Sequence, residues 1–190
     1  MCTGKCARFI GVSLYPLALT SIICNILLFF PGWDVKYAKD GYLTEEVKYM
    51  GGLIGGGIMV LIPAIHIHLT GKGGCCANRC GMFLSIAFAA VGVAGALYSF
   101  VVAMLGLVNG PYCRVGLIWM TPFKDKENSY LNNQDSWFLC SAPDNVIRFN
   151  IALFSTLVAV SGVQTIMCSI QMINGLFGCL CGTCKSKGPY

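Results

Sequence analysis

Four long apolar segments dominate the pattern of hydrophobic and polar positions along the chain. They cover roughly residues 9–30, 49–69, 82–108 and 149–177, and none has Asp, Glu, Lys or Arg in its interior. A helix of about 20 apolar residues crosses the roughly 30 Å hydrocarbon core of a bilayer, whereas a membrane β-barrel needs strands of alternating polarity. Each segment is therefore predicted to be a transmembrane helix.

The connections between these segments predict how the helices are arranged. The connections are short, at residues 31–48, 70–81 and 109–148. Helices joined in this way pack side by side in opposite directions. The sequence predicts an all-α integral membrane protein, in which an antiparallel bundle of four transmembrane helices forms a single domain over residues 1–190.

Composition agrees with a membrane protein. Hydrophobic residues make up 56% of the chain and charged residues 11%, against about 25% charged residues in an ordinary soluble domain. The formal net charge is +5, but Lys and Arg form no dense cluster and no stripe interleaved with aromatic residues. We therefore expect no nucleic-acid partner.

The distribution of charge predicts the orientation in the membrane. Segments 1–8, 70–81 and 178–190 contain Lys or Arg but no acidic residue, whereas loops 31–48 and 109–148 contain both signs. Because basic residues in short connections favour the cytoplasmic side, both termini are predicted to be cytoplasmic. The two loops of mixed charge, 18 and 40 residues long, are then extracellular.

Small residues in the second and third segments predict close helix packing. Gly51 and Gly55, and again Gly52 and Gly56, are four residues apart, and the third segment continues this pattern with Gly92 and Ala96. Such spacing presents a flat helix face that lets backbones approach closely. Packing within the bundle is the favoured interpretation, and lateral association with another membrane protein is the alternative.

Polar residues within or near the ends of the apolar segments allow two interpretations. A channel or transporter could use them as a relay, whereas a packed bundle would use them in hydrogen bonds between helices. The second is favoured because no acidic residue lies in the apolar segments to bind a cation or carry a proton. The residues are Asn25, His66, His68, Gln164, Gln171 and Asn174.

Several short motifs together carry a family resemblance. They are MCTGKCAR at residues 1–8, NILLFFP at 25–31, GGLIGGG at 51–57, NGP at 109–111 followed by Cys113, FN at 149–150 leading to LFS at 153–155, and INGL at 173–176 before CG at 181–182. With these motifs in order from end to end, the chain resembles the transmembrane four L six family, a group of tetraspanin-like surface proteins.

The resemblance implies a function but no catalysis. It implies an adaptor of the plasma membrane or endosomal membranes that associates with receptors such as integrins, and with tetraspanins, and affects adhesion, migration and proliferation. It implies no enzyme activity and no cofactor. Unlike true tetraspanins, this chain has only two cysteines in its large loop, and it has no Asn-x-Ser/Thr glycosylation sequon.

The predicted orientation divides the cysteines by compartment. Cys113 and Cys140 are the only extracellular pair and are predicted to form a disulfide, with an intermolecular bridge as the alternative. Eight others lie near span ends in the cytoplasm, where S-palmitoylation is favoured and inert thiols are the alternative. A zinc site is disfavoured because paired Cys-x-x-Cys units are absent. These eight are Cys2, Cys6, Cys75, Cys76, Cys80, Cys179, Cys181 and Cys184.

Aromatic residues are dense in the large loop. Trp119, Phe123, Tyr130 and Trp137 are candidates for partner contact, although a small core around the disulfide, or a place at the bilayer interface, is favoured. The loops contain no His, so no Ser-His or Cys-His pair can form there, and no metal site is expected. A claudin-like junction protein is disfavoured because the first loop has no cysteine. The sequence does not decide between a monomer and a homo-oligomer.

Overall fold

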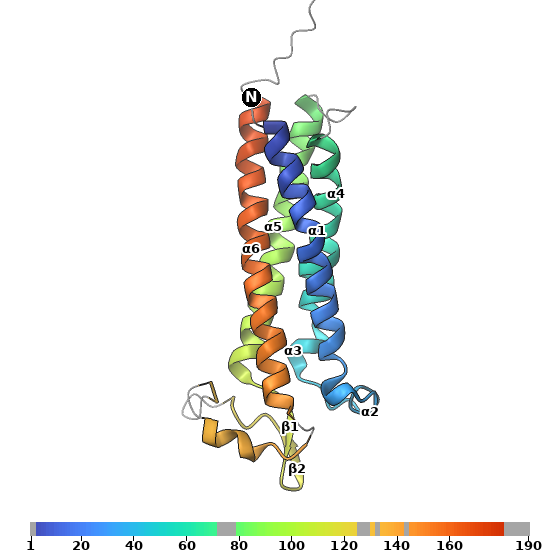
Figure 1. Ribbon diagram of the computed structural model, residues 1–190, viewed down its shortest axis with the longest axis vertical. Coiled ribbons are helices and arrows are strands. Elements are labelled where there is room, and N and C mark those ends of the chain that lie inside the picture. The colour runs from blue at the N-terminus through green and yellow to red at the C-terminus, as the bar shows by residue number, and fades with distance from the viewer. Residues whose placement is uncertain (1–2, 72–78, 125–129, 132–133, 143–144, 181–190) are drawn as a thin grey trace, which may run out of the picture.

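The computed structural model describes residues 3–71, 79–124, 130–131, 134–142 and 145–180. Four long helical segments run through it: α1 (Thr3–Leu28), the π-helix η2 (Gly51–Ile58) continued by α4 (Met59–Gly71), α5 (Arg79–Asn109) and α6 (Val146–Leu180) (Figure 1). All four are long and apolar enough to cross a membrane. The predicted bundle of four transmembrane helices is confirmed.

Helix ends differ from the predicted span ends. α1 begins at Thr3 rather than near residue 9, and α6 runs from Val146 to Leu180 rather than from 149 to 177. The apolar pattern marks only the part of a helix that meets the hydrocarbon core. Backbone hydrogen bonding continues beyond that part, so a helix extends into polar residues that hydropathy assigns to the loops.

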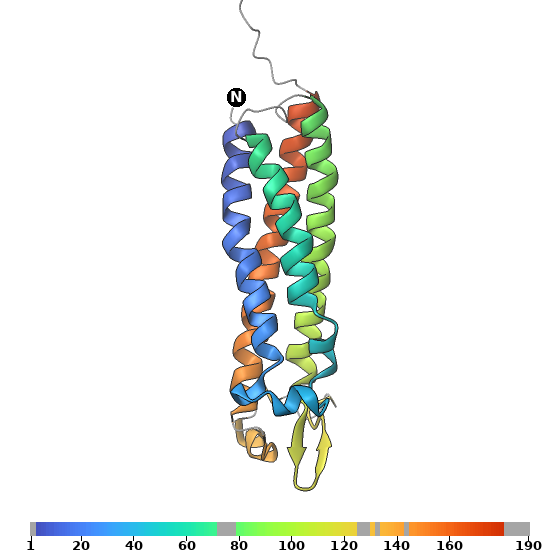
Figure 2. The same cartoon turned by 90° about the vertical axis from the view of Figure 1, so that its right-hand side faces the viewer.

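The helices form a ring in which each packs mainly against two neighbours. α1 packs against α4 and α6, and α5 packs against the same two helices (Figures 1 and 2). The start of α1 and the end of α6 lie at the same end of the bundle, here called the terminal end (Figures 1 and 2). The opposite end carries short elements of the two loops and is called the loop end.

The buried face of α6 follows a seven-residue repeat. Its buried positions are alternately four and three residues apart, which is the spacing of left-handed coiled coils, with ridges of one helix packed into grooves of the next. Several members are small or polar rather than large and apolar. The repeat consists of Asn150, Phe154, Leu157, Ser161, Gln164, Cys168, Gln171, Gly175 and Gly178.

Glycines of η2 bring the second span close to its neighbours. A Cβ atom built on Gly55 would lie 2.5 Å from the carbonyl oxygen of Gly95, so the backbones of η2 and α5 touch at this point. A Cβ on Gly52 would lie 2.8 Å from the Ser21 carbonyl oxygen of α1. Gly95 belongs to this contact but was not singled out by the sequence pattern.

The remaining small residues of the predicted packing set also face neighbouring helices. A Cβ on Gly51 would meet the Val102 side chain at 2.9 Å, and one on Gly92 would meet the Cys168 sulfur at 2.9 Å. Ala96 is fully buried. All of these positions therefore lie inside the bundle, between its own helices.

The start of the second span is a π-helix whose backbone is hydrogen-bonded by side chains of other spans. Asn25 of α1 accepts a hydrogen bond from the Leu53 backbone N–H at 2.7 Å through its Oδ1 atom, and Gln164 of α6 donates to the Gly56 carbonyl at 2.8 Å. Glycine is a poor α-helix former, so a glycine-rich sequence accepts the wider turn at little cost.

The loop end contains short elements that the all-α prediction did not include. The first loop forms η1 (Pro31–Trp33), α2 (Lys36–Lys39) and α3 (Glu45–Lys48). The large loop forms a two-stranded antiparallel hairpin, β1 (Cys113–Val115) and β2 (Ile118–Met120), and a 3-10 helix, η4 (Gln134–Leu139). These elements are short, and the four-helix bundle still makes up most of the fold.

We expect Gly55→Ala to destabilise the protein. The added methyl group would force η2 away from α5, and overpacking of this kind costs about 1–3 kcal/mol. Gly162→Ala is the matched control, because its Cβ would meet only the Phe100 ring, at 3.8 Å, and alanine is the better helix former. Thermal unfolding of both variants in detergent measures the difference. Equal unfolding midpoints would contradict the backbone contact.

Candidate functional site

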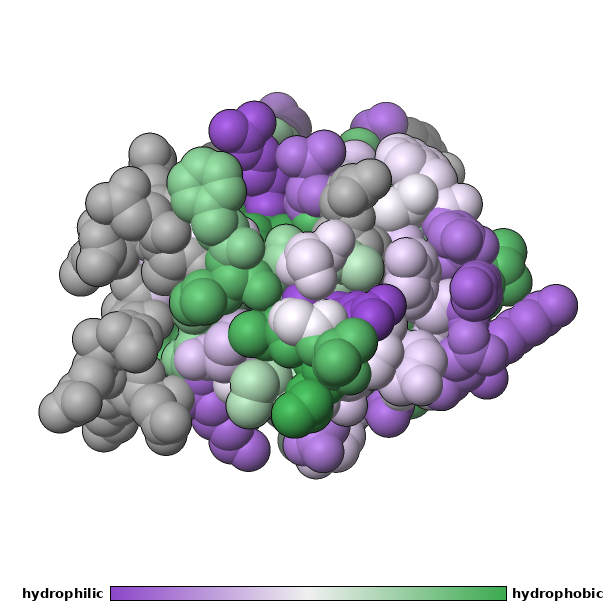
Figure 3. Space-filling view, turned by 90° about the horizontal axis from the view of Figure 1, so that it is seen from below, coloured by the Kyte–Doolittle hydropathy of each residue, from purple (hydrophilic) through white to green (hydrophobic). Residues whose placement is uncertain are grey.

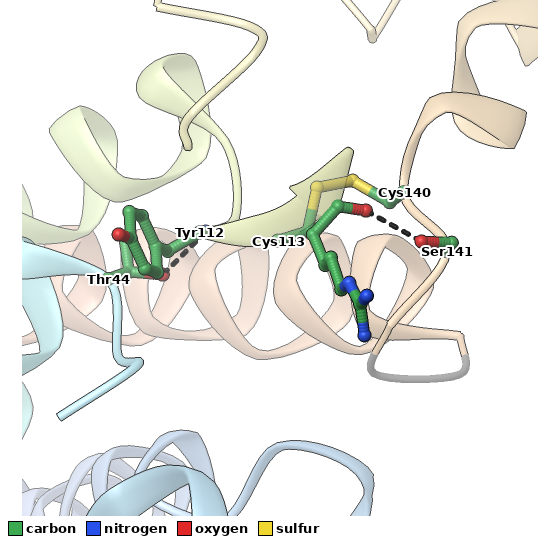
Figure 4. The surroundings of a disulfide bond; sticks show 6 residues. Thr44, Tyr112, Cys113, Cys140 and Ser141 are labelled. Carbon is green, nitrogen blue, oxygen red and sulfur yellow. Dashed lines mark hydrogen bonds between the residues drawn. A yellow bond between two sulfur atoms is a disulfide. The ribbon is translucent and has the colours of Figure 1, made fainter. Parts of the chain in front are cut away.

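The large loop is closed by a disulfide and joined to the start of α6. Cys113 and Cys140 are bonded, which confirms the predicted intramolecular bridge, and their Cα atoms are 5.5 Å apart (Figure 4). Beside it, the Arg114 N–H donates to the Ala142 carbonyl at 3.0 Å, and the Ser141 N–H donates to the Arg114 carbonyl at 2.9 Å. A bridge across 27 residues stabilises the loop by roughly 3–4 kcal/mol on a chain-entropy estimate.

Two of the four aromatic candidates lie in a small core beneath this disulfide. Phe123 is 2% exposed and Tyr130 is fully buried, and their rings are 4.8 Å apart between centroids. Trp137 is partly buried and donates from its indole N–H to the Tyr130 carbonyl at 2.9 Å. These side chains are packed inside the loop, which is the arrangement that the sequence analysis favoured over partner contact.

The fourth candidate, Trp119, joins the two loops. Its ring stacks on Tyr42 of the first loop, with centroids 4.3 Å apart and planes 9° apart, and Tyr112 stacks on it at 6.0 Å. The Tyr112 N–H also donates to the Thr44 hydroxyl at 3.2 Å (Figure 4). The two loops therefore form one folded unit, which the sequence did not predict.

The C-terminal end of α5 is capped by residues from the loop and from α6. The last carbonyl groups of a helix have no partner within the helix. Here the Tyr130 hydroxyl donates to the Leu107 carbonyl, and the Asn150 side-chain amide donates to the Gly106 carbonyl at 3.3 Å. Burial raises the pKa of Tyr130 to about 12, against a smaller lowering by a hydrogen bond with Asn150.

A sequence signal for this helix end was present. Gly110 has a φ of +76° directly after the last residue of α5, and Pro111 follows it. Glycine in this left-handed conformation followed by proline is a common way to end a helix. The signal locates the end of α5, but it does not identify Tyr130 and Asn150 as the residues that cap it.

Among the described residues of the large loop, the most exposed apolar side chains are not the predicted ones. Phe138 of η4 is 91% exposed, Leu117 at the tip of the hairpin is 87% exposed and Ile118 is 67% exposed. Viewed from below, the loop end shows hydrophobic surface set among hydrophilic residues (Figure 3). Phe138, Leu117 and Ile118, here called the exposed apolar group, are available for contact with another molecule.

Polar side chains fill the bundle axis at mid-height. The Ser161 hydroxyl donates to the Ser99 hydroxyl at 2.8 Å, and the Gln164 amide reaches the Ser21 hydroxyl at 3.4 Å. A Cβ on Gly56 would come within 2.9 Å of both the Ser21 and the Ser99 oxygens. All four spans therefore meet at this level without space for one more methyl group.

The other intramembrane polar residues also bond within the bundle. The Gln171 amide donates to the Ser85 hydroxyl at 2.8 Å, and Asn174 donates to the Gln171 side-chain oxygen at 3.3 Å. His68 lies 3.2 Å from the Tyr15 hydroxyl through its Nδ1 atom, and the His66 ring packs on Phe88. The contacts of Gln171 with Ser85, of His68 with Tyr15 and of His66 with Phe88 join different helices, whereas that of Asn174 with Gln171 lies within α6.

Three of the eight predicted lipidation cysteines lie within the described residues. Cys6 and Cys179 are half-buried near the terminal ends of α1 and α6, and Cys80 lies in the first turn of α5. The other five lie outside the described residues: Cys2, Cys75, Cys76, Cys181 and Cys184. In the part of the chain that the structure describes, no three His, Cys, Asp or Glu side chains are grouped to hold a metal ion.

Removing the Tyr130 hydroxyl tests the cap on α5. We expect Tyr130→Phe to cost about 1–3 kcal/mol near neutral pH, because the Leu107 carbonyl stays buried without its donor. The folded pKa of about 12 exceeds the ordinary value of 10.0, so wild type loses this contribution as pH rises from 10 to 12. The stability gap between wild type and variant should therefore narrow over that range.

Thermal unfolding between pH 7 and 12 measures this gap. Tyr49→Phe is the control because the Tyr49 side chain is exposed, and its pH dependence should match that of wild type. A gap for Tyr130→Phe that stays constant up to pH 12 would contradict the burial of this phenol.

Comparison with known proteins agrees with this architecture. A family model described as L6 membrane protein matches residues 1–185. Transmembrane 4 L6 family member 5 from Bos taurus is 44% identical over 192 residues, covering 98% of this chain and 97% of the relative. Member 4 from Rattus norvegicus is 44% identical over 97% of this chain and 95% of its own length, and member 1 from Homo sapiens is 42% identical over 98% and 96%. No solved structure shows significant similarity. The chain belongs to the L6 membrane protein family.

Proposed function

We propose that this protein is a non-enzymatic organiser of the membrane, which associates laterally with surface receptors of the integrin type and so modulates adhesion, migration and proliferation. In this proposal both termini are cytoplasmic, the loop end is extracellular, and the protein resides in the plasma membrane and in endosomal membranes. The charge distribution supports the orientation, since segments 1–8, 70–81 and 178–190 carry basic but no acidic residues.

The exposed apolar group carries this proposal. Phe138, Leu117 and Ile118 project from a loop that a disulfide and its own aromatic core hold together. Large apolar side chains exposed on a rigid surface mark sites of protein interaction, because burial against a partner removes them from water. A rigid loop also loses little conformational entropy on binding.

The alternative of a channel or transporter has less support. A conducting path along the bundle axis would need space and polar groups that face it. Instead, Gln164 donates to the Ser21 hydroxyl and to the Gly56 carbonyl, and Ser161 donates to the Ser99 hydroxyl, across a level with no room for a methyl group. Their role in this proposal is to hold the four spans in register.

Acylated cysteines complete the proposal. Cys6, Cys80 and Cys179 belong to the parts of α1, α5 and α6 near the terminal end, and in the proposed orientation this end lies at the reducing cytoplasm. Juxtamembrane cysteines there are substrates for reversible palmitoylation. Four spans already anchor the protein, so acyl chains would act on its lateral distribution and choice of neighbours.

Co-purification tests the proposed association. We expect tagged wild-type protein, extracted in a mild detergent, to recover an integrin and to lose it in a stringent detergent. A Leu117→Ser/Phe138→Ser variant should recover at least several-fold less integrin, because it removes the apolar contact. Lys39→Ser, in the exposed surface of the first loop, is the control and should behave as wild type. Equal recovery by all three proteins would contradict the proposal.

Acyl exchange tests the lipidation. Treatment with hydroxylamine, after free thiols are blocked, should reveal thioester-linked lipid on several of the eight candidate cysteines, and replacing all eight by Ser should abolish the signal. Cys24 and Cys168 are buried among the spans and serve as internal controls that should stay unmodified. A wild-type protein without any thioester signal would refute this part of the proposal.

A further inference from the structure

A cavity of about 200 Å³ lies at the loop end between α3, the end of α5 and the hairpin side of the large loop. Its walls include Glu46, Lys48, Asn109, Tyr112 and Lys124. A space of this size is smaller than a typical site for a drug-sized ligand, but it accepts a small polar group.

Glu46 is the unusual member of this lining. Glu46 is only 9% exposed, and its Oε1 atom accepts a hydrogen bond from the Asn109 side-chain amide at 2.6 Å. Within the described residues, its Oε2 atom has no hydrogen-bond partner and its carboxylate forms no ion pair. This oxygen is not among the buried side-chain atoms without a partner, so it is accessible, and a ligand that brings a positive charge into the cavity could form a charge-assisted hydrogen bond with it.

The cavity also carries positive charge at its edge. Lys48 and Lys124 line it and are exposed, and neither forms an ion pair with another described residue. With Glu45 also in the lining, two carboxylates face two ammonium groups, so the charges of the site balance. A ligand that carries both signs matches this arrangement better than a simple anion or a simple cation does.

The depth of the cavity indicates where such a ligand comes from. Asn109 is the last residue of the span Phe83–Asn109, and Glu46 lies just before the span that begins at Gly51. A helix of 27 residues is about 40 Å long, which equals the thickness of a bilayer with its polar headgroup layers. The cavity therefore lies at the level of the lipid headgroups.

We propose that this cavity binds the zwitterionic headgroup of a phospholipid, with its ammonium group at Glu46 and its phosphate at Lys48 and Lys124. The Tyr112 ring in the wall offers an aromatic surface to the cationic end. This inference concerns a lipid site and stands independently of the receptor association proposed above.

Native mass spectrometry of the purified full-length protein in detergent tests it. Phosphatidylcholine and phosphatidylethanolamine are titrated against phosphatidylglycerol with the same acyl chains, which lacks the cation, and against glycerophosphocholine, which lacks the acyl chains. We expect either zwitterionic lipid to bind at least about tenfold more tightly than phosphatidylglycerol, because a charge-assisted hydrogen bond to Glu46 is lost without the ammonium group. Glycerophosphocholine should bind weakly.

Two variants identify the site. Glu46→Gln keeps the shape of the side chain and should remove the preference for zwitterionic lipid, whereas Lys48→Gln/Lys124→Gln lies at the exposed edge and should weaken every phospholipid. The control Lys39→Gln/Asp40→Asn changes exposed charges of the same loop outside the cavity and should bind as wild type does. Thermal unfolding checks that each variant is folded.

Two results would overturn the proposal. The first is equal affinity for zwitterionic lipid and phosphatidylglycerol in wild type, or affinities that both cavity variants leave unchanged. The second is binding of glycerophosphocholine as tight as that of the lipid, which would identify the ligand as a soluble zwitterion rather than a membrane lipid.

Discussion

Backbone contact between the second and third spans sets the geometry of the whole bundle. Gly55 and Gly95 allow η2 and α5 to approach until their main chains touch, and this approach brings Gly56 against the hydroxyl groups of Ser21 and Ser99. From the other two spans, Asn25 and Gln164 form hydrogen bonds to the π-helical backbone of the same segment. In hydrocarbon, where apolar burial does not drive helices together, such close packing supplies the attraction.

The loop end depends on the same bundle through the end of α5. Tyr130 and Asn150 satisfy the last carbonyl groups of that helix, and in doing so they fix the large loop on one side and α6 on the other. The disulfide joins the first strand of the hairpin, at Cys113, to the residue after η4, at Cys140. A small number of polar contacts thus fastens the loop end to the helices of the bundle.

The extent to which the sequence predicted this structure differs between its parts. Span number and helix class follow from apolar length alone, and the disulfide follows from having only two cysteines, Cys113 and Cys140, on one predicted side of the membrane. The role of Gly95 could not be read from a chain with 23 glycines, because small residues occur throughout the third span. The stacking of Trp119 on Tyr42 joins residues distant in the chain, and no local pattern encodes such a contact. Phe123 and Tyr130 lie in the small core that the sequence analysis favoured over partner contact, but the sequence did not indicate which carbonyl groups Tyr130 and Asn150 would cap.

The joining of the two loops has a consequence for how the molecule is recognised from outside its bundle. Thr44 bonds to Tyr112, Glu46 bonds to Asn109, and Tyr42 stacks on Trp119, so residues from both loops share one continuous surface. An antibody that binds this surface recognises a discontinuous epitope. A linear peptide copied from either loop lacks half of that epitope and also lacks the helix ends that give it shape.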